Sequence, residues 1–372
     1  MWQAVVRLMR SDGLKPGART MPPQPRPMPT ANPFIQAPFA PDPGNLRMFV
    51  HLPRGLKAGA PLVVVLHGCG QSAAAYGVES GWWQLAEEMG FALLAPEQKV
   101  VNNPNTCFDW FNPEDITRGA GEAASIAAMI RTMVETYHLD KSRVFITGLS
   151  AGGAMTAVML ATYPELFAGG GIVAGIPFGA AQNVRDALEA MRSAPLRTPG
   201  EWGDAVRAAS PWAGPWPKIS IWHGALDPVV NINNAQASVA QWADLHGVAL
   251  TDAHQEMLTG AVRLNWGDRM ELYTLPILGH GTPIDSSDVG RPAPFVLEAG
   301  ISSARRMARF WGLAPAVMAQ KPVPKPVPIP PPVSALPKIE TALTVQAQTV
   351  VSAGKDNFIL RALKAAGLVR KV

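Results

Sequence analysis

A glycine-rich turn at residues 148–152 constrains this chain more than any other stretch. Residues 143–147 are rich in side chains that favour a strand, and they run directly into Gly148-Leu149-Ser150-Ala151-Gly152. Apolar residues then recur at helical spacing as far as Pro164, which disfavours helical geometry in the residue before it. A strand, a G-x-S-x-G turn and a helix in this order are typical of a nucleophile elbow. We therefore predict that Ser150 is a catalytic nucleophile.

Strands and helices alternate on both sides of this turn. Strands are expected at residues 48–52, 61–66, 91–95, 170–175, 218–222 and 270–275, and helices at 82–89, 121–138, 235–245 and 295–311. Residues 61–66 are continuously apolar, as in strands buried on both faces of a parallel sheet. The alternation predicts an α/β fold with a doubly wound, mostly parallel sheet. An insertion at residues 182–217, rich in Trp and Pro, could cover the active site.

The two ends of the chain differ from its middle. We predict a Pro-rich N-terminal extension (1–47), a catalytic domain (48–313), a polyproline linker (314–333) and a basic C-terminal tail (334–372). The prolines deny residues 11–47 a regular helix or central strand, so this segment is expected to wrap the domain or stay mobile. Residues 355–372 have the spacing of a short basic amphipathic helix, and we hypothesise weak docking of this tail on a surface. The alternative is a solvated tail.

Charge and hydropathy exclude several classes of protein. The chain has 32 Lys and Arg against 28 Asp and Glu, yet only 18 of the basic residues and 24 of the acidic residues lie between 48 and 313. Basic residues there are scattered and form no motif, so we expect no nucleic-acid partner. No window reaches the roughly 18 uninterrupted apolar residues of a membrane span. Arg7 and Arg10 interrupt the apolar run that a signal peptide needs, so classical secretion is not supported and the location stays open.

A serine hydroxyl needs a base that accepts its proton and an acid that orients this base. In hydrolases of this topology the two follow the nucleophile in the order Asp or Glu, then His. Asp227 follows the strand at 218–222, with an Asp-Pro turn as the alternative interpretation. His280 lies between two glycines just after the last strand, where the loop can carry its ring over the sheet edge. We predict Asp227 as the acid and His280 as the base.

The other histidines near these positions are expected to be structural. His246 and His254 are interpreted as solvated residues near a helix end, and His223 as a packed or hydrogen-bonded residue beside Asp227. His67 is expected to support a loop by hydrogen bonding.

Backbone N–H groups must stabilise the oxyanion of a tetrahedral intermediate. In this architecture one belongs to the residue after the nucleophile, here Ala151, and the other to the loop after an early strand, here Cys69. Gly68 and Gly70 flank Cys69 and would let backbone approach a substrate closely.

Four stretches, at residues 66–71, 107–111, 148–153 and 223–227, together resemble the polyhydroxybutyrate depolymerase family of esterases, which is related to feruloyl and acetylxylan esterases. The resemblance covers about residues 45–312. It implies an α/β-hydrolase fold, a triad of Ser150, Asp227 and His280, and the Cys69 N–H in the oxyanion hole. It also implies an extracellular or periplasmic location, with a cytoplasmic location as the alternative.

One stretch departs from this family. Many relatives read Gly-His-Ala-Trp-Pro-Gly around the histidine, whereas this chain has Gly279-His280-Gly281-Thr282-Pro283 and lacks the aromatic residue beside the base. Trp110 and Phe111 resemble the aromatic loop that lines the acyl site in this family. A core pair of aromatic side chains is the alternative interpretation.

The chain has two cysteines, Cys69 and Cys107, too few for a disulfide scaffold and without metal-ligand spacing. We hypothesise that a disulfide joins the oxyanion loop to the aromatic loop, and two free thiols are the alternative.

The sequence as a whole predicts a serine esterase, a carboxylic ester hydrolase that resembles the poly(3-hydroxybutyrate) depolymerases. Its expected substrates are short hydroxyacyl or acyl esters, as small molecules or in a polyester, cleaved through an acyl-enzyme. No cofactor and no metal are expected, because no H-E-x-x-H or P-loop motif is present. The alternatives are a feruloyl- or acetylxylan-type carbohydrate esterase and a hydrolase-like binding protein without turnover.

Overall fold

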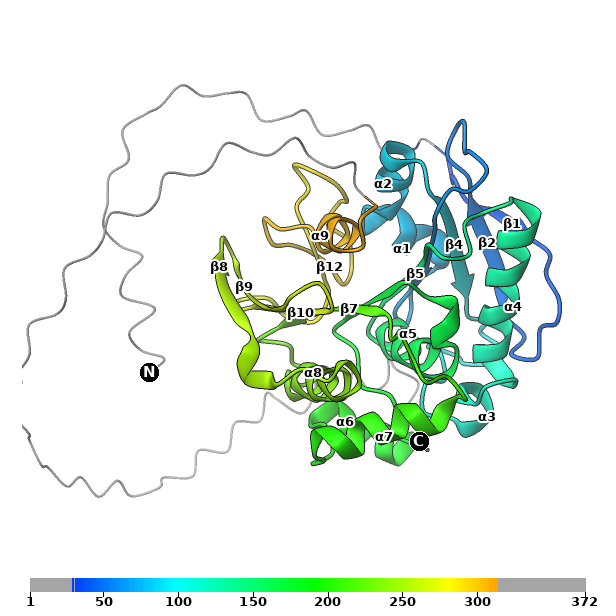
Figure 1. Ribbon diagram of the computed structural model, residues 1–372. Helices are drawn as coiled ribbons and strands as arrows, with labels where there is room; N and C mark the ends of the chain where they lie inside the picture. Colours follow the sequence, from blue (N-terminus) through cyan, green and yellow to red (C-terminus); the bar gives the residue numbers. More distant parts are fainter. Residues whose placement is uncertain (1–28, 30, 314–372) are drawn as a thin grey trace, which may run out of the picture.

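A computed structural model describes residue 29 and residues 31–313. The predicted polyproline linker and basic tail, and most of the predicted N-terminal extension, lie outside the described residues. The centre of the described chain is one twisted sheet of ten strands (Figure 1). In order across this sheet, the strands are β1 (Ile35–Ala37), β2 (Arg47–His51), β4 (Ala92–Glu97), β3 (Leu62–Leu66), β5 (Val144–Leu149), β6 (Gly169–Val173), β7 (Lys218–Gly224), β10 (Met270–Leu275), β9 (Ala261–Trp266) and β8 (His254–Leu258).

The strand directions divide the sheet into a parallel centre and antiparallel edges. Strands β4, β3, β5, β6, β7 and β10 are parallel to their neighbours within this group. Strands β2 and β1 extend one edge in antiparallel pairing, and β9 and β8 extend the other. The predicted doubly wound, mostly parallel sheet is confirmed. Its central strands all end at the same edge, so the loops that follow them lie close together.

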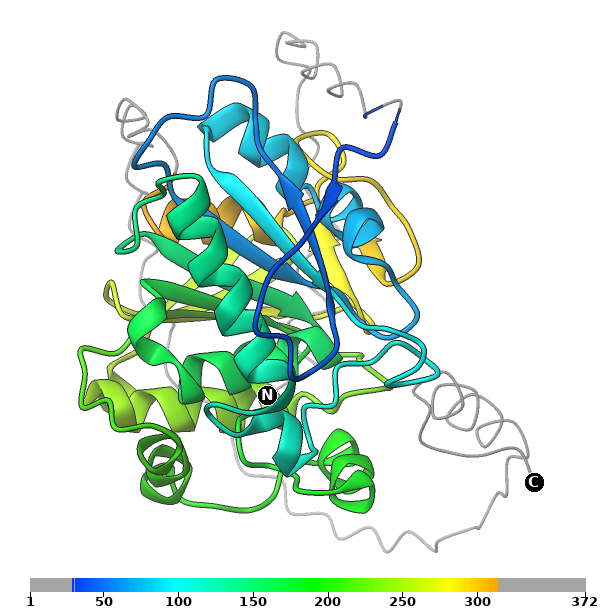
Figure 2. The same cartoon turned by 90° about the vertical axis from the view of Figure 1, so that its right-hand side faces the viewer.

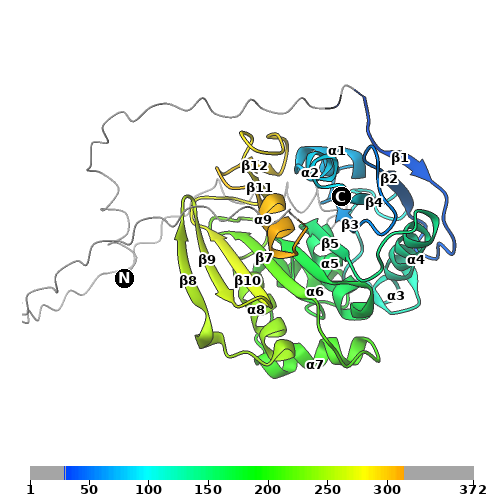
Figure 3. The ribbon, with the colours of Figure 1, turned by 45° about the horizontal axis from the view of Figure 1, so that its top comes forward.

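Helices cover both faces of the sheet (Figure 3). One layer contains α1, α2 and α9, and the other contains α3 to α8. The helices are α1 (Ala73–Glu79), α2 (Trp82–Met89), α3 (Pro113–Ile116), α4 (Gly121–Thr136), α5 (Ala151–Thr162), α6 (Val184–Arg192), α7 (Pro199–Ala209), α8 (Asn233–His246) and α9 (Ser303–Phe310). Two 3-10 turns (Pro164–Leu166 and Leu250–Asp252) and a small parallel sheet of β11 (Thr282–Ile284) and β12 (Val296–Glu298) complete the described chain.

The pattern of side chains explains why the sheet is buried on both faces. All five residues of β3 are inaccessible to solvent, because Val64 packs into the core beneath α4 and α5 while Val63 and Val65 pack into the core beneath α1, α2 and α9. Continuous apolar runs are the sequence pattern of such strands. Helix α2 has the predicted bounds and ends at Gly90, whose φ of 73° suits glycine at a helix C-terminus.

The folded part of the chain begins earlier than predicted, so the domain boundary at residue 48 is too late. Strand β1 pairs with β2 at the sheet edge, where an irregular, proline-flanked segment can add a short strand (Figure 2). Phe34 is 3% exposed and packs so close to Gly77 that a Cβ there would lie 2.6 Å from its ring. Further along, the Ser125 hydroxyl donates to Asp42 and accepts from the Gly44 N–H. The expected wrapping of the domain is therefore present in residues 34–46.

Two other expectations for the chain order were wrong. Strands β8 and β9 form a hairpin between α8 and β10, where we expected no strand. The expectation failed because the exposed residues of β8 lack the apolar alternation of a strand. The last helix begins at Ser303, not at residue 295. The Ser302 hydroxyl accepts from the Arg305 N–H and caps this helix, while residues 296–298 form β12.

The insertion at residues 182–217 forms α6 and α7. The Gln241 side chain of α8 binds the carbonyl oxygens of Phe178 and Trp202, so the insertion is attached to the helix layer below the sheet. Its role as a cover for the active site stays a prediction. No helix in residues 31–313 is both long enough and apolar enough to cross a membrane.

Candidate active site

Ser150 lies at the sharp turn between β5 and α5, as the G-x-S-x-G pattern predicts. Its backbone has φ 56° and ψ −116°, an unfavourable conformation for a residue with a side chain. A Cβ on Gly148 would lie 2.3 Å from the Gly152 oxygen, and one on Gly152 would lie 2.3 Å from the Leu66 oxygen. Only glycine fits at both positions, because neighbouring backbone occupies the space of a side chain. These two contacts hold the serine in place at the end of β5.

The structure brings Ser150, His280 and Asp227 together in one chain of hydrogen bonds. His280 Nδ1 lies 2.7 Å from Asp227 Oδ2, and His280 Nε2 lies 2.9 Å from Ser150 Oγ. An ionised carboxylate can only accept, so Nδ1 carries a hydrogen and Nε2 is left to accept from the serine hydroxyl. All three residues stand at the edge where β5, β7 and β10 end. This arrangement can transfer a proton from the serine to the imidazole.

The Asp227 carboxylate is held from several sides. Its Oδ1 accepts from the N–H groups of Val229 at 2.8 Å and Val230 at 2.9 Å. Burial alone would raise the pKa of this carboxyl, but the hydrogen bonds from His223 and His280 and their charge outweigh burial and hold the pKa well below its usual value. Asp227 therefore stays ionised over the neutral pH range. The turn formed by these backbone bonds orients the Asp227 carboxylate. The Asp-Pro turn and the role as triad acid are therefore compatible interpretations of this residue.

His223 contacts this acid directly. Its Nε2 lies 2.8 Å from the Val230 oxygen and 3.4 Å from Asp227 Oδ2, and the residue is 2% exposed. Both partners are acceptors, so Nε2 carries the hydrogen. The expectation of a packed, hydrogen-bonded histidine beside Asp227 agrees with this geometry.

The loop that carries His280 passes close to the end of β7. A Cβ on Gly224 would lie 2.3 Å from the Leu278 oxygen and 2.4 Å from the Gly279 oxygen, so glycine is needed there. Of the glycines that flank His280, only Gly281 is crowded, since a Cβ on Gly279 would have nothing within 4 Å. Sequence reasoning missed Gly224, although it is one residue of the matched stretch at 223–227.

The candidate oxyanion donors lie on adjoining segments. Ala151 is the first residue of α5, where N–H groups have no partner within the helix. The end of β3 touches α5 at Gly152, and a Cβ on Gly68 would lie 3.4 Å from the Leu149 oxygen. Among residues 31–313, neither the Ala151 N–H nor the Cys69 N–H has a hydrogen-bond acceptor. Free donors at these two positions fit the predicted oxyanion hole.

Several bonds fix the loop that contains Cys69. A disulfide joins Cys69 to Cys107 of the loop after β4. The Gly70 N–H donates to the Asn105 oxygen at 2.8 Å. Gln71, which sequence reasoning did not single out, accepts from the Gly68 N–H at 2.9 Å and donates to the Pro294 oxygen at 3.1 Å. Gln71 thus connects the oxyanion loop to the segment that follows the His280 loop.

Phe295 provides an aromatic side chain beside the predicted base. Its ring meets the His280 ring edge to face, with the centroids 5.9 Å apart, and the residue is 44% exposed. Sequence reasoning placed Phe295 in a helix and expected no aromatic residue beside His280. The contact joins positions fifteen residues apart in the chain through irregular segments, which no local pattern encodes.

Trp110 and Phe111 lie in the core. They are 8% and 9% exposed and meet edge to face at 5.4 Å. This geometry favours the interpretation as a core pair, and a contact with substrate stays a prediction.

Three further histidines named in the sequence analysis make no hydrogen bond to Ser150 or Asp227 within the part of the chain that the structure describes. Fully buried His67 accepts from the Gln98 N–H at Nε2, and its Nδ1 is 2.8 Å from the Gly68 oxygen, as expected for a residue that supports the loop. His254 is an exposed residue of β8. His246 was wrongly expected to be solvated: it is half-buried, and burial followed by the charge of Arg269 lowers its pKa to about 4.

One group of side chains in the described chain has the composition of a metal site. Oxygen atoms of Asp109, Asp115 and Glu122 lie within 4.8 Å of one another. Burial raises the pKa of Asp109 to about 6 and that of Glu122 well above its usual value. The Gln98 amide and the Asp109 N–H donate to Glu122, and the Asn103 amide donates to Asp109. The raised pKa values favour protonated carboxyl groups, and these donors bind the carboxyl oxygens. Both explain how the three acidic side chains can lie close together without a metal ion.

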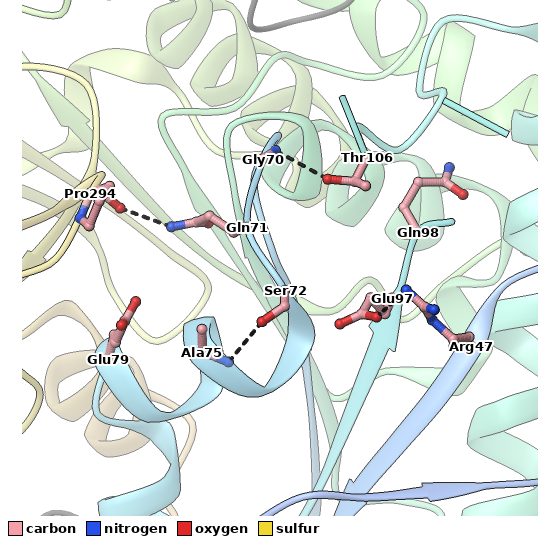
Figure 4. Close-up of a pocket in the computed structure, with 10 residues that line it drawn as sticks. All are labelled: Arg47, Gly70, Gln71, Ser72, Ala75, Glu79, Glu97, Gln98, Thr106 and Pro294. Carbon is pink, nitrogen blue, oxygen red and sulfur yellow. Dashed lines mark hydrogen bonds and ion pairs between the residues drawn. The ribbon is translucent and has the colours of Figure 1, made fainter. Parts of the chain in front are cut away.

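A polar pocket of about 430 Å³ adjoins the oxyanion loop (Figure 4). An ion pair between Arg47 and Glu97, 2.6 Å long, forms part of its wall. The pocket is lined by Arg47, Gly70, Gln71, Ser72, Ala75, Glu79, Glu97, Gln98, Thr106 and Pro294. Hydroxyl, amide and paired charged groups suit a neutral ligand that carries oxygen atoms.

Comparisons with known proteins identify the family of this chain. The family model "Esterase PHB depolymerase" matches residues 46–265. Poly(3-hydroxyalkanoate) depolymerase C of Paucimonas lemoignei is 42% identical over 74% of this chain and 69% of its own length. An acetylxylan esterase of Coprinopsis cinerea is 33% identical over 68% of this chain and 69% of its own length. Feruloyl esterase B of Talaromyces stipitatus is 30% identical over 68% of this chain and 72% of its own length.

A solved structure shows the same fold. The acetyl xylan esterase of Aspergillus awamori superposes with a TM-score of 0.65 and 25% identity, covering 76% of this chain and 99% of the other. The predicted α/β-hydrolase fold and the predicted family are confirmed. The chain belongs to the esterase PHB depolymerase family and is a carboxylic ester hydrolase.

Proposed function

We propose that this protein is a serine esterase that cleaves short hydroxyacyl or acyl esters through an acyl-enzyme, with Ser150, His280 and Asp227 as its triad. The single observation that carries the proposal is the hydrogen-bonded chain from Ser150 Oγ through the His280 ring to Asp227. Similarity to a poly(3-hydroxyalkanoate) depolymerase supports hydroxyacyl esters as the substrate class.

In the first half of the reaction, Ser150 Oγ attacks the carbonyl carbon of the ester while His280 Nε2 accepts the serine proton. The carbonyl oxygen becomes an oxyanion, and the N–H groups of Cys69 and Ala151 donate to it. Asp227 stabilises the imidazolium. The carbon–oxygen bond to the alcohol then breaks, and His280 gives its proton to the leaving alcohol oxygen, which leaves an acyl group on Ser150.

In the second half, water attacks the acyl carbon and His280 accepts a proton from that water. The bond from carbon to Ser150 Oγ breaks, and the serine oxygen takes the proton back from His280. The products are a carboxylic acid and the free enzyme, so each group on the protein returns to its starting state. Every proton passes through His280 Nε2, so this nitrogen must carry no hydrogen at the start.

A second candidate function is a carbohydrate esterase that removes acetyl or feruloyl groups. The polar pocket beside the oxyanion loop favours it, because the lining groups suit a hydroxyl-bearing ligand. The relatives named as acetylxylan and feruloyl esterases support it further.

One experiment separates these functions from a binding protein without turnover. A fluorophosphonate probe should label wild-type protein at Ser150, identified by peptide mass spectrometry, and leave Ser150→Ala unlabelled. Turnover of short hydroxybutyrate oligomers, acetylated xylan and feruloyl esters is then compared at equal protein concentration. Preference for the oligomers supports the polyester function, and preference for the sugar esters supports the second. Absence of labelling would contradict both.

A further inference from the structure

Phe295 has an unusual combination of exposure and backbone strain. Its side chain is 44% exposed, and its φ of 61° lies in the left-handed region that bulky residues avoid. Such a conformation persists only where the surroundings enforce it, and it is concentrated at functional sites. Exposure of a large apolar ring next to the predicted base is therefore a feature that the fold maintains.

Contacts on both sides hold Phe295 in this conformation. Its carbonyl oxygen accepts from the Thr282 N–H at 2.8 Å, two residues after His280. A Cβ on Gly281 would lie 2.8 Å from the same oxygen, so the two segments touch closely. The preceding residue, Pro294, is bound to Gln71 of the oxyanion loop at 3.1 Å. Phe295 is thus anchored to both the base loop and the oxyanion loop.

The mechanism of ester cleavage determines which part of a substrate lies beside the His280 ring. His280 Nε2 must give its proton to the alcohol oxygen as that oxygen leaves, so the alcohol portion of the ester lies beside the His280 ring. The acyl portion stays on Ser150. Phe295 packs edge to face against the His280 ring and remains exposed, so its ring is within reach of a group bound beside His280.

We propose that Phe295 is a specificity-determining residue that packs against the alcohol portion of the ester. Pro294, the residue before Phe295, lines the polar pocket (Figure 4). An alcohol with an apolar part near the ester and further oxygen atoms beyond it fits both surfaces. The proposal rests on the proposed function, since it needs a serine esterase with His280 as the proton donor.

The test compares two series of substrates. One series keeps the acetyl group and varies the alcohol from ethyl to butyl to benzyl, and the other keeps p-nitrophenol and lengthens the acyl chain. Phe295→Ala should lower kcat/KM for benzyl acetate about fivefold or more relative to ethyl acetate, because the larger alcohol loses more apolar contact. Phe295→Leu should recover part of the loss. Along the acyl series, the effect of Phe295→Ala should be the same for every chain length.

A kinetic control separates specificity from a general disturbance of His280. After the burst of p-nitrophenol, the steady-state rate reports deacylation, in which no alcohol is present. Phe295→Ala should leave this rate within twofold of wild type. Met257→Ala removes another exposed apolar side chain, 65% exposed on β8, and should change neither series.

Slower deacylation in Phe295→Ala, a loss that grows along the acyl series, or unchanged alcohol preference would each overturn the proposal. Phe295→Gly, which relieves the backbone strain at φ 61°, provides a second variant should the alanine variant fold poorly. Fluorophosphonate labelling at Ser150 is measured in every variant. Labelled protein with unchanged alcohol preference contradicts only the role of Phe295, whereas unlabelled wild type contradicts the proposed function itself.

Discussion

The nucleophile side and the base side of the candidate site are built by different means. On the nucleophile side, Ser150 is fixed by backbone packed against backbone: strand β5 lies in the parallel centre of the sheet, and Gly148 and Gly152 touch neighbouring main chain. On the base side, His280 lies in an irregular loop positioned by Asp227, Phe295 and the close passage over Gly224. Rigid secondary structure places the proposed nucleophile, while contacts between side chains and loops place the proposed base and acid.

The largest expected effect is the loss of ester hydrolysis when the proposed nucleophile or the proposed base is replaced. Ser150→Ala and His280→Ala should each lower kcat for an activated ester by at least about 10⁴-fold, since nucleophile and base act as one unit. Thermal unfolding should stay cooperative, because neither change opens a large cavity. Purified variants are assayed with p-nitrophenyl acetate and followed by circular dichroism. More than a tenth of wild-type activity in either variant would remove that residue from the triad.

The disulfide tests how much the oxyanion loop depends on its neighbour. Closing a 38-residue span between Cys69 and Cys107 is worth about 4 kcal/mol in the chain-entropy account. Cys107→Ser, which leaves the Cys69 N–H unchanged, should lower the free energy of unfolding in urea by about this amount. Adding dithiothreitol to wild type should reproduce the loss and leave Cys107→Ser unaffected. Two free thiols titrated in denatured, non-reduced wild type would contradict the bridge.

Glycine substitutions compare the two sides directly. Gly152→Ala should destabilise the protein by about 3 kcal/mol, because its Cβ would lie 2.3 Å from the Leu66 oxygen and backbone cannot yield. Gly279→Ala, with nothing within 4 Å, should change stability by less than about 0.5 kcal/mol. Urea unfolding midpoints measure both. Equal losses at the two positions would mean that the base loop is as tightly packed as the elbow.

The same contrast explains what could be predicted from the sequence. The elbow, helix α2 and the buried strand β3 are encoded locally, by glycines at fixed spacing and by apolar runs. Asp227 and His280 could be chosen because chain order restricts which residues can follow Ser150. Phe295, Gln71 and Gly224 matter through contacts between distant segments, and neither composition nor periodicity records those contacts. Both edge strands β1 and β8 were missed because β1 has only three residues, too few for an alternating pattern, and β8 begins with three polar residues.

His223 tests whether the base side needs support for its acid. Its Nε2–H lies between the Val230 oxygen at 2.8 Å and Asp227 Oδ2 at 3.4 Å. His223→Leu should lower kcat about tenfold with KM nearly unchanged, because Asp227 loses a donor and its turn loosens. His223→Gln, whose amide N–H can reach the same acceptors, should recover most of the activity. Equal loss in both variants would mean that His223 only fills space.

A last expected effect concerns pH, because the carboxyl groups of Asp227 and Asp109 have opposite pKa shifts. Asp227 has a lowered pKa, so its contribution to stability is present above about pH 4 and is lost as the pH falls further. Asp109 lies in the loop that the disulfide joins to the oxyanion loop. Burial raises the pKa of this carboxyl to about 6. Between about pH 4 and pH 6 the unfolded chain releases this proton while the folded protein keeps it, so rising pH destabilises the fold.

Asp109→Asn should remove this cost and keep the hydrogen bond from Asn103, which needs only an acceptor oxygen. The variant should match wild type near pH 4 and become the more stable of the two as the pH rises to 7, as measured by urea unfolding at half-unit intervals. Asp268→Asn, at a side chain that is 82% exposed, is the matched control and should shift nothing. If the difference between Asp109→Asn and wild type were constant from pH 4 to 7, the carboxyl would be ionised throughout. Another interaction would then have to offset the repulsion between the Asp109 and Glu122 carboxylates.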